Sequence, residues 1–436
     1  MLTVDELPSR RLVEYEHVAG PEVVEDLFRL AEPLRGARVL HVNATAFGGG
    51  VAELLTSLVP LMRDAGLDCH WQVLEGPPEF FATTKTMHNA LQGAEVCWSS
   101  AQAEIWRSVN RCNARAIDDS WDYVVVHDAQ PAAILASAAM DNGVRPQGRW
   151  TWRCHVDLTD ASSNVWNFLA PYVAGYDAGI FSMPDYVRPG LSLNSVRIVP
   201  PAIDPLSEKN RPVEKVVVRG VLERYGIDLN RPIMLQVSRF DPWKDPVGVI
   251  DAYRLARTEV RTLQLLMIGS MADDDPEGWE WYERTVAHAG GDEDIHVYTN
   301  LDGVNAHEVN CFQRAADVVV QNSTREGFGL VVSEALWKER PVVARDAGGI
   351  PIQIRHGESG HLITTSEECA DSVVHYLKHP EERRAAGAAG RARVRDHFLI
   401  TRYLGDYLAL FNDLGRRPAA EVVERAGAPV LSAAAV

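Results

Sequence analysis

Two glutamates flank a glycine-rich turn in the segment REGFGLVVSEAL, residues 325–336. A strand pattern ends before this turn and a helix pattern begins within it, so the amides of residues 327–329 are expected at the positive end of a helix. Amides in that position bind hydroxyl or phosphate oxygens. Glu326 in the turn and Glu334 inside the helix are then placed to hold two parts of one ligand. A buried structural role explains either acid alone, but it explains both together less well.

A second segment, VSRFDPWKDP at residues 237–246, carries two cations at the carboxyl end of a strand. Arg239 offers a planar fork of donors and Lys244 offers a point charge, so the two side chains complement each other on a diphosphate. In an acidic chain, two cations at this place form a plausible clamp for an anion. The alternative interpretation is a solvated surface loop.

Glycine-rich turns follow two further strands. TAFGGGVAELL, residues 45–55, places three glycines before a helix, where the backbone can approach a ligand and the helix end favours an anion. The order differs from the G-x-G-x-x-G of dinucleotide-binding proteins, and no acid follows at the distance that a dinucleotide ribose needs. RDAGGIPIQI, residues 345–354, would bound the same site. Either segment alone is equally well explained as a tight turn.

Two histidines come at the ends of predicted strands, each with an acid close behind. His155 and Asp157 end or follow RWTWRCH, and His127 and Asp128 follow DYVVV. A histidine at the carboxyl end of a parallel strand can hydrogen-bond a ligand hydroxyl or a developing charge. A single histidine is as often structural, so a structural role is the alternative at both positions.

Signals for a bound metal are weak. The acids at 273–275 precede a proline, which is typical of a solvated loop. Asp292 and Asp294 form an Asp-x-Asp pattern, but they lie in the loop sequence GGDEDI. The six cysteines are widely spaced without a C-x-x-C pair, which fits neither a zinc site nor a disulfide framework. We predict no bound metal, and free thiols in a reducing compartment.

Apolar runs of strand length alternate with amphipathic stretches, as in the βα units of a parallel sheet. Strands are predicted at 37–43, 68–74, 122–127, 149–155, 178–182 and 196–200, then at 233–239, 263–269, 295–300, 316–322 and 340–346. Helices are predicted at 51–66, 131–140, 246–258, 276–290, 306–314 and 329–338. The proline-rich segment 200–212 separates the two series. The predicted fold class is α/β, with two Rossmann-like doubly wound halves and a ligand site between them.

This pattern divides the chain into an N-terminal domain, residues 1–205, and a C-terminal domain, residues 206–400. A helix at 401–415 is expected to cross back to the N-terminal domain. The alanine-rich residues 416–436 are expected to form a flexible tail.

The formal net charge of −17 excludes classes of protein that need clustered positive charge. A nucleic-acid-binding surface must neutralise phosphates, and a polybasic membrane anchor needs grouped Lys and Arg. The sequence MLTVDELPSRR at the N-terminus lacks an apolar signal segment, and no apolar run reaches the length that spans a bilayer. We expect a cytoplasmic protein whose partners are small molecules, with exposed apolar surface consistent with a homodimer.

The glycine-rich loop, the pair Arg239 and Lys244, and the pair Glu326 and Glu334 together resemble the pattern of the family-4 retaining glycosyltransferases. A closer resemblance is to the trehalose glycosyltransferring synthases. It is carried by NATAFGGGVAELLTSLVPLMRDAG, SRFDPWK, TNLDGVNAHEVNCFQRAAD and REGFGLVVSEALWK, and extends over most of the chain. One departure is Asp245, where the wider family commonly has glycine. A carboxylate there would tune donor binding or point to solvent.

The resemblance implies the GT-B fold, with two Rossmann-like domains facing a deep interdomain cleft, and a donor that is ADP-, UDP- or GDP-glucose. No bound cofactor is expected, and Mg²⁺ would be at most an activator. The implied catalytic residues are Arg239, Lys244, Glu326 and His155. The implied donor site comprises Gly48, Gly49, Gly50, Arg239, Lys244, Asn305, Glu326, Gly327, Phe328, Gly329, Leu330 and Glu334. The implied acceptor site comprises Lys85, Asn89, His127, Asp128, His155 and Asp157.

The reaction implied by the resemblance transfers glucose to glucose, forms trehalose and retains the anomeric configuration. Both glutamates would bind the donor, so the leaving diphosphate itself would take the proton of the acceptor. Three alternatives stay open. They are a retaining trehalose phosphorylase that uses phosphate in place of the nucleotide, a glycosyltransferase of the same fold with another sugar or cyclitol acceptor, and an inactive sugar-nucleotide-binding protein.

Overall fold

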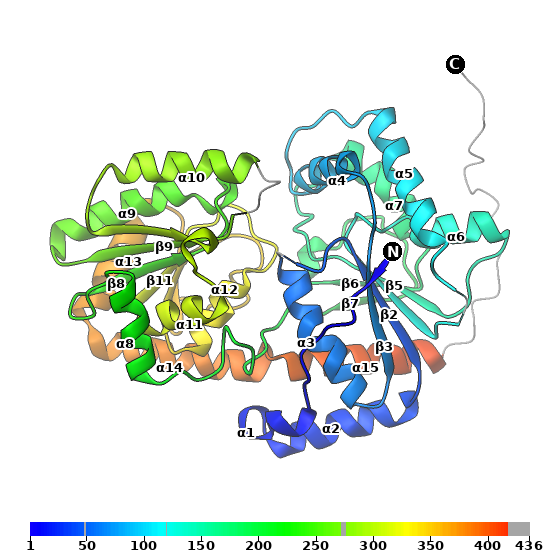
Figure 1. The fold of residues 1–436 in the computed structure, drawn as a ribbon, viewed down its shortest axis with the longest axis horizontal. Coiled ribbons are helices and arrows are strands. Elements are labelled where there is room, and N and C mark those ends of the chain that lie inside the picture. The colour runs from blue at the N-terminus through cyan, green and yellow to red at the C-terminus, as the bar shows by residue number, and fades with distance from the viewer. Residues whose placement is uncertain (48, 119, 272–275, 417–436) are drawn as a thin grey trace.

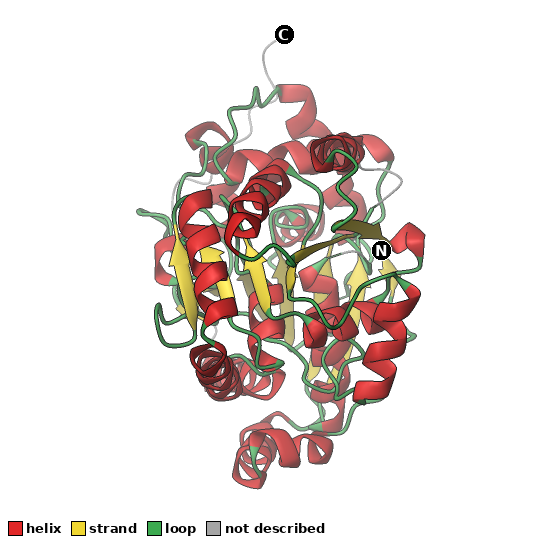
Figure 2. Cartoon of the chain, turned by 90° about the vertical axis from the view of Figure 1, so that its left-hand side faces the viewer, coloured by secondary structure: helices red, strands yellow, loops and turns green. Residues whose placement is uncertain are grey.

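Two β-sheets, one in each half of the chain, form the framework of the molecule (Figure 1). The computed structural model describes residues 1–47, 49–118, 120–271 and 276–416. Figure 2 shows the strands lying between layers of helices. Strands that are covered on both faces are apolar along their whole length. In β4 (Tyr123–His127) every residue is buried.

The first sheet has the strand order β1-β3-β2-β4-β5-β6-β7. Besides β4, its strands are β1 (Leu2–Thr3), β2 (Arg38–Asn43), β3 (Asp68–Val73), β5 (Arg149–Arg153), β6 (Ala178–Phe181) and β7 (Val196–Ile198). Strand β1 pairs antiparallel with β3 at one edge, and the other neighbours are parallel. This doubly wound order brings the carboxyl ends of β2, β4 and β5 to one edge, where ligands bind in such sheets.

The second sheet is parallel throughout, in the order β10-β9-β8-β11-β12-β13. Its strands are β8 (Ile233–Val237), β9 (Gln264–Gly269), β10 (Ile295–Thr299), β11 (Val318–Gln321), β12 (Val342–Arg345) and β13 (Gly360–Ile363). The order reverses between β8 and β11, so the loops that follow these two strands face each other at the switch point.

Helices cover both faces of each sheet. Those of the first half are α1 (Glu16–Ala19), α2 (Pro21–Ala31), α3 (Gly50–Asp64), α4 (Pro78–Leu91), α5 (Ser100–Ala114), α6 (Ile134–Asn142) and α7 (Ser163–Val173). Those of the second half are α8 (Lys215–Arg224), α9 (Pro246–Glu259), α10 (Pro276–Ala289), α11 (Ala306–Ala315), α12 (Leu330–Trp337), α13 (Ser366–Lys378) and α14 (Pro380–His397). Each sheet therefore has an apolar core on either face.

The last helix, α15 (Ile400–Arg416), returns to the first half of the molecule. Figure 1 shows α14 along one half and α15 along the other. Helix α15 packs against α2 and α3, and the Tyr123 hydroxyl donates to the Phe411 carbonyl at 3.0 Å. At the crossing, the Ile203 amide donates to the Phe398 carbonyl at 2.9 Å, and the Ile400 amide donates to the Ile203 carbonyl at 2.9 Å. The chain thus crosses between the halves twice, in two hydrogen-bonded segments.

Among the helices that the structure describes, none combines the length and the apolar character needed to span a bilayer.

Candidate functional site

The glycine-rich turn before α12 is shaped by close packing against the other half of the molecule. Gly329, the residue before α12, has φ 80°, a left-handed conformation that glycine adopts without strain. A Cβ on Gly327 would lie 2.5 Å from the His155 carbonyl oxygen, closer than real Cβ atoms come. Only glycine fits between the turn and His155, so the sequence GFG sets how closely the two sheets approach here.

Glu326 lies in this turn and is paired with Lys244. The Lys244 Nζ donates to Glu326 Oε2 at 2.5 Å, and Ser323 Oγ donates to the same oxygen at 3.2 Å. The side chains of Lys244 and Glu326 are only 13% and 12% exposed. A lysine ammonium has three donors, so Lys244 can hold Glu326 and still donate to a phosphate.

Arg239 lies on the same loop as Lys244 but is half-exposed, with 56% of its side chain open to solvent. Its guanidinium pairs with Asp241 at 2.9 Å. The Asp241 carboxylate also accepts the Lys244 amide at 3.1 Å, which starts a short 3-10 turn, η4 (Pro242–Lys244). Arg239 therefore has several donors left for a ligand beside the Lys244 pair.

Asp245 does not point to solvent, and its backbone explains why glycine is common at this position in the wider family. Its φ is 45°, in the left-handed region. Its carboxylate accepts the Gly248 amide at 3.1 Å and so caps α9, and it accepts the Asn322 amide group at 2.7 Å. Arg345 lies 3.4 Å away. Burial raises the pKa of the Asp245 carboxyl. The carboxylate is thus engaged in capping α9.

Glu334 lies inside α12 and is fully buried. The side-chain amide of Gln313 donates to its Oε2 at 3.1 Å, and the Lys209 ammonium lies 3.3 Å from its Oε1. Lys209 also pairs with Glu53 of α3 at 2.7 Å. Burial opposes the charge of Lys209, but the carboxylates of Glu334 and Glu53 raise its pKa on balance. Lys209, in the segment between the sheets, therefore connects a helix of each half.

The glycine-rich loop after β2 meets α12 across the boundary between the halves. Helix α3 begins at Gly50, and a Cβ on that residue would lie 3.2 Å from Leu330 Cδ1. Gly49 precedes it in an extended conformation with open space around its Cα, and Gly48 lies outside the described residues. The amino ends of α3 and α12 thus lie against each other.

His127 and His155 form part of a chain of rings rather than an open surface. The Nδ1 of His127 lies 3.0 Å from Nε2 of His155, and its Nε2 lies 3.0 Å from Nδ1 of His41 on β2. His127 is 2% exposed, so it lies behind His155. Burial lowers the pKa of both residues well below its ordinary value, and the charge of Arg153 lowers both further.

Asp128 adopts a left-handed backbone with φ 64°. Its carboxylate accepts the His155 amide at 2.7 Å, and burial raises its pKa to about 6. Asp157 is buried and accepts the Thr159 amide at 2.9 Å in a local turn. A left-handed backbone at a residue other than glycine, as at Asp128, is common at functional sites.

The remaining predicted residues lie around this centre. The Lys85 Nζ of α4 lies 3.7 Å from the Glu277 Oε2 of α10, which belongs to the other half. Asn89 lies one turn further along α4 and is partly buried. Asn305 is exposed and precedes α11, where its backbone amide donates to the Glu308 carboxylate at 3.1 Å. Phe328 is buried and belongs to one of the two apolar cores that cover the second sheet.

Sequence reasoning missed two residues that interact with the other half of the molecule, Tyr186 by hydrogen bonds and His88 by electrostatics. The Tyr186 hydroxyl donates to the carbonyls of Glu326 and Gly327 at 3.1 and 3.0 Å, which fixes the glycine-rich turn. His88, between Lys85 and Asn89 on α4, lies within the electrostatic influence of Arg239 from the other half. Burial, then the charges of Arg239 and Lys85, lower the pKa of His88 to about 4. The helical spacing of three from Lys85 could have indicated His88, whereas nothing in FSMPDY pointed to Tyr186.

The weak metal candidates are explained by ion pairs where the structure describes them. Asp292 and Asp294 both pair with Arg257, at 2.7 and 2.6 Å, and Asp294 also pairs with Arg231 at 2.6 Å. The acids at 273–275 lie outside the described residues. His375, His379 and Glu382 form a mostly exposed group where α13 ends and α14 begins, and neither helix carries a predicted site residue.

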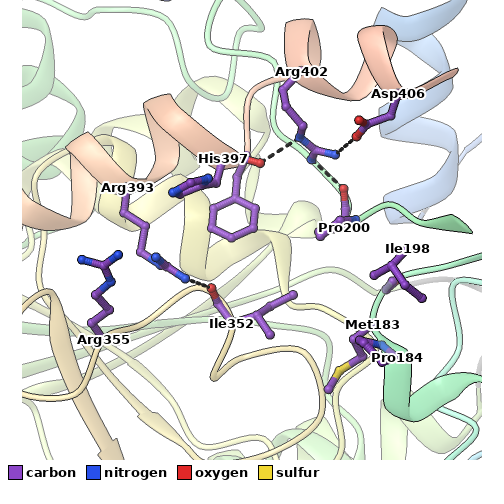
Figure 3. A pocket seen from close by; sticks show the side chains of 12 residues that line it. Met183, Pro184, Ile198, Pro200, Ile352, Arg355, Arg393, His397, Arg402 and Asp406 are labelled. Carbon is purple, nitrogen blue, oxygen red and sulfur yellow. Dashed lines mark hydrogen bonds and ion pairs between the residues drawn. The ribbon is translucent and has the colours of Figure 1, made fainter. Parts of the chain in front are cut away.

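A cavity of about 590 Å³ lies where α14 passes into α15 (Figure 3). On its wall Arg402 pairs with Asp406 at 2.5 Å and donates to the Pro200 carbonyl at 2.6 Å, while Arg393 donates to the Ile352 carbonyl. A second cavity, of about 350 Å³, is lined by Ile203, Asp204 and Ile400 among others. Both cavities border the crossing between the halves, and no predicted site residue lies among the lining of the first.

Two doubly wound sheets that meet at facing glycine-rich helix starts, with a lysine–glutamate pair beside them, define a glycosyltransferase of the GT-B type. A family model described as trehalose synthase, N-terminal domain, matches residues 41–188. A second, described as glycosyl transferases group 1, matches residues 221–393. The chain belongs to the trehalose synthase family.

Curated relatives support the same family. The trehalose synthase of Pyrococcus horikoshii is 47% identical over 419 residues, which cover 95% of this chain and 100% of the relative. That of Rubrobacter xylanophilus is 49% identical over 408 residues, covering 93% of this chain and 97% of the relative. The trehalose phosphorylase of Pleurotus sajor-caju is more distant, at 28% identity over 82% of this chain and 55% of the phosphorylase.

Solved structures share the fold at low identity. A UDP-forming trehalose-phosphate synthase from Burkholderia xenovorans, in complex with glucose-6-phosphate, matches with a TM-score of 0.69 and 14% identity, covering 86% of this chain and 100% of that one. Anabaena HepE, in complex with UDP and glucose, matches with a TM-score of 0.65 and 13% identity, covering 86% and 99%. These likenesses concern the fold alone.

Proposed function

We propose that this glycosyltransferase is a retaining trehalose synthase, which transfers a glucosyl group from a nucleoside diphosphate glucose to free glucose. The observation that carries the proposal is the Lys244–Glu326 pair, 2.5 Å apart, beside helix-start amides and the backbone of His155. A cation, a carboxylate and helix-start amides at one point suit an anionic leaving group attached to a sugar. HepE, which shares the fold, was solved with UDP and glucose bound.

In this proposal the C-terminal domain, residues 206–400, binds the donor. Arg239 and Lys244 neutralise the diphosphate, and Glu326 with the amides of the glycine-rich turn holds the glucose. Glu334 binds the ribose. Its buried Oε1 faces the Lys209 ammonium at 3.3 Å and receives no hydrogen bond of good geometry among the described residues, so it can also accept from a ribose hydroxyl. The loop near Asn305 would lie against the base.

The N-terminal domain, residues 1–205, would bind the acceptor through the region of Lys85, Asn89 and Asp128, with His155 at the donor sugar. The amino end of α3 would close over the donor, and α15 would tie the second domain to the first. Water is then excluded from the reacting centre, which limits hydrolysis of the donor.

The way in which the two glutamates are engaged supports a retaining mechanism without a covalent intermediate on the enzyme. Glu326 pairs with Lys244, and Glu334 accepts from Gln313 with Lys209 beside it, so neither is free to attack the sugar as a nucleophile. The leaving diphosphate would instead accept the proton of the acceptor hydroxyl, on the same face of the sugar. Arg239, Lys244 and the helix-end amides stabilise the charge that develops. Mg²⁺ is at most an activator in this scheme.

The test is a matrix of ADP-, UDP- and GDP-glucose against several acceptors, with the product and its anomeric configuration identified by NMR. We expect α,α-trehalose and release of a nucleoside diphosphate. Release of glucose 1-phosphate in the presence of phosphate would instead identify a phosphorylase. Transfer only to another sugar or cyclitol would correct the acceptor, and donor binding without turnover would indicate an inactive binding protein.

The roles of the two cations are tested by substitution. Lys244→Ala and Arg239→Ala should each lower kcat by roughly 10²- to 10³-fold, because each removes a charge-assisted contact to the leaving group. Arg261→Ala, at an exposed arginine, is the control. Circular dichroism and Tm show whether the variants fold. Unchanged turnover in a folded Lys244→Ala variant would remove Lys244 from the mechanism.

A further inference from the structure

Three imidazole rings from neighbouring strands form a continuous chain that ends at His155. His41 lies on β2, His127 at the end of β4, and His155 two residues after the end of β5. Both nitrogen–nitrogen distances along the chain are 3.0 Å, and consecutive ring centroids are 5.3 Å apart. His41 and His127 are buried, so they cannot reach a ligand themselves.

The surroundings of the chain keep all three rings neutral. Burial lowers the pKa of His41 to about 3, and it lowers the pKa of His127 and His155 well below the ordinary range. The fully buried guanidinium of Arg153 also disfavours a positive charge on His127 or His155. The carboxylate of Asp128 is bonded to the backbone amide of His155. Tyr407 of α15 packs its ring against His41, with centroids 5.9 Å apart.

Neutral imidazoles have one N–H donor and one acceptor each, so a chain of three must run in one direction. If the protons run inward, the buried Nε2 of His41 carries a hydrogen. If they run outward, Nε2 of His41 is a bare lone pair and Nδ1 of His155 carries the last hydrogen. That Nε2 atom has no partner among the described residues. A buried N–H without an acceptor is rarer in proteins than an unsatisfied acceptor, so the outward direction is favoured.

We propose that His41 and His127 are positioning residues, which fix His155 in the tautomer that presents an Nδ1–H donor to a hydroxyl oxygen of the bound sugar. No described residue hydrogen-bonds the Nδ1 of His155, so this donor is available to a ligand. The identity of the ligand as a sugar rests on the proposed function. The direction of the chain does not, because it is a property of the protein without ligand.

The tautomer is measured directly by long-range ¹⁵N–¹H NMR on ligand-free protein labelled with ¹⁵N-histidine. A His155→Gln variant assigns the signals of that ring. We expect the proton of His155 on Nδ1 in the parent protein. His41→Leu removes the origin of the chain and should leave His155 as a mixture of both tautomers. His41→Asn keeps an amide donor near the position of Nδ1 and should restore the parent tautomer. A proton on Nε2 of His155 in the parent would overturn the proposal.

Kinetics separate this role from a merely structural one. His41→Leu should lower kcat/KM for the donor by about 3- to 10-fold, the effect of one mis-set hydrogen bond, and His41→Asn should recover most of the loss. The Tm of both variants shows whether the core is intact. If His41→Leu folds with unchanged kcat/KM and an unchanged tautomer, His41 has no positioning role. If the tautomers behave as expected but no donor yields trehalose, the proposed function fails and the chain of histidines stands.

Discussion

At the residue scale, the position of Asp128 in the fold determines both its backbone conformation and the pKa of its carboxyl group. Its left-handed φ of 64° turns the chain at the end of β4 and aims the carboxylate at the His155 amide, 2.7 Å away. Asn and Asp tolerate this conformation better than most residues. Burial raises the pKa of this carboxyl to about 6. Above that pH the ionised carboxylate therefore lowers the free energy of unfolding.

Asp128→Asn should therefore change how stability depends on pH. Between about pH 4 and pH 6 the folded protein keeps a proton on Asp128 that the unfolded chain, with an ordinary pKa near 3.9, has lost. The free energy of unfolding of the parent consequently falls as pH rises through this window, and the asparagine variant lacks that fall. We expect the variant to equal the parent near pH 4.5 and to exceed it by about 1–2 kcal/mol near pH 8.

Urea unfolding at both pH values measures this difference. Asp371→Asn, at an exposed position of α13, is the matched control and should show no such pH-dependent gain. An Asp128→Asn variant that is less stable than the parent at pH 8 would show that the carboxylate is favoured in the folded state.

Residue types at a ligand site could be read from the sequence, but their partners could not. The segments that contain Arg239, Lys244 and Glu326 are recognisable because glycine, cations and acids follow predicted strands. His41 gave no signal, since it lies within the apolar run ARVLHVN. Its link to His127 depends on the order of β2, β4 and β5 in the sheet. Tyr186 acts across the two halves, which no local pattern reports.

At the element scale, the turn before α12 is held by the turn that follows β12. Gly348 has φ 51°, and a Cβ on it would lie 1.7 Å from the Glu326 carbonyl oxygen. The Gly349 amide donates to that same oxygen at 3.1 Å. The two glycine-rich turns therefore form one unit, and the position of Glu326 depends on a residue that cannot touch the ligand through a side chain.

Gly348→Ala tests this dependence against Gly357→Ala. Gly357 also has a positive φ, 78°, but an added Cβ there meets nothing within 4 Å. Both variants carry the left-handed penalty of about 1–2 kcal/mol. Gly348→Ala must in addition displace the Glu326 turn, so we expect a larger loss of unfolding free energy in urea and weaker donor binding by calorimetry. Equal effects of the two substitutions would show that the turns move independently.

The sequence predicts most strands and misses several helices. The β2, β4, β8, β9 and β11 segments are apolar runs bounded by turns, and the structure confirms them. Helices α4, α5 and α13 are absent from the sequence prediction, and β13 has only four residues, too few for periodicity to separate it from a loop. The antiparallel pairing of β1 involves two residues, too few for any pattern.

At the scale of the whole molecule, the halves are joined by charge as well as by backbone. Arg325 pairs with Asp160 at 3.0 Å across the boundary. Lys209 lies between Glu53 and Glu334, and the Glu334 carboxylate is fully buried. Because a buried carboxylate is stable only when it is paired, the linker lysine helps to set the relation between α3 and α12.

Lys209→Met should destabilise the protein by roughly 1–3 kcal/mol, less than the loss from a wholly buried pair because Lys209 is 24% exposed. The reason is the carboxylate of Glu334, which keeps only the Gln313 amide. Chemical denaturation measures the loss, and Lys215→Met, at an exposed position of α8, is the control. Adding Glu334→Gln should recover part of the stability. No recovery would mean that Lys209 acts through packing alone.

The two crossings between the halves are hydrogen-bonded to each other at Ile203, beside Phe398 and Ile400, and both cavities border them. Because the two connections are hydrogen-bonded to each other, a rotation of the backbone at one of them also moves the other. We therefore expect any reorientation of one sheet relative to the other to move both segments together, about the hydrogen-bonded joint at Ile203.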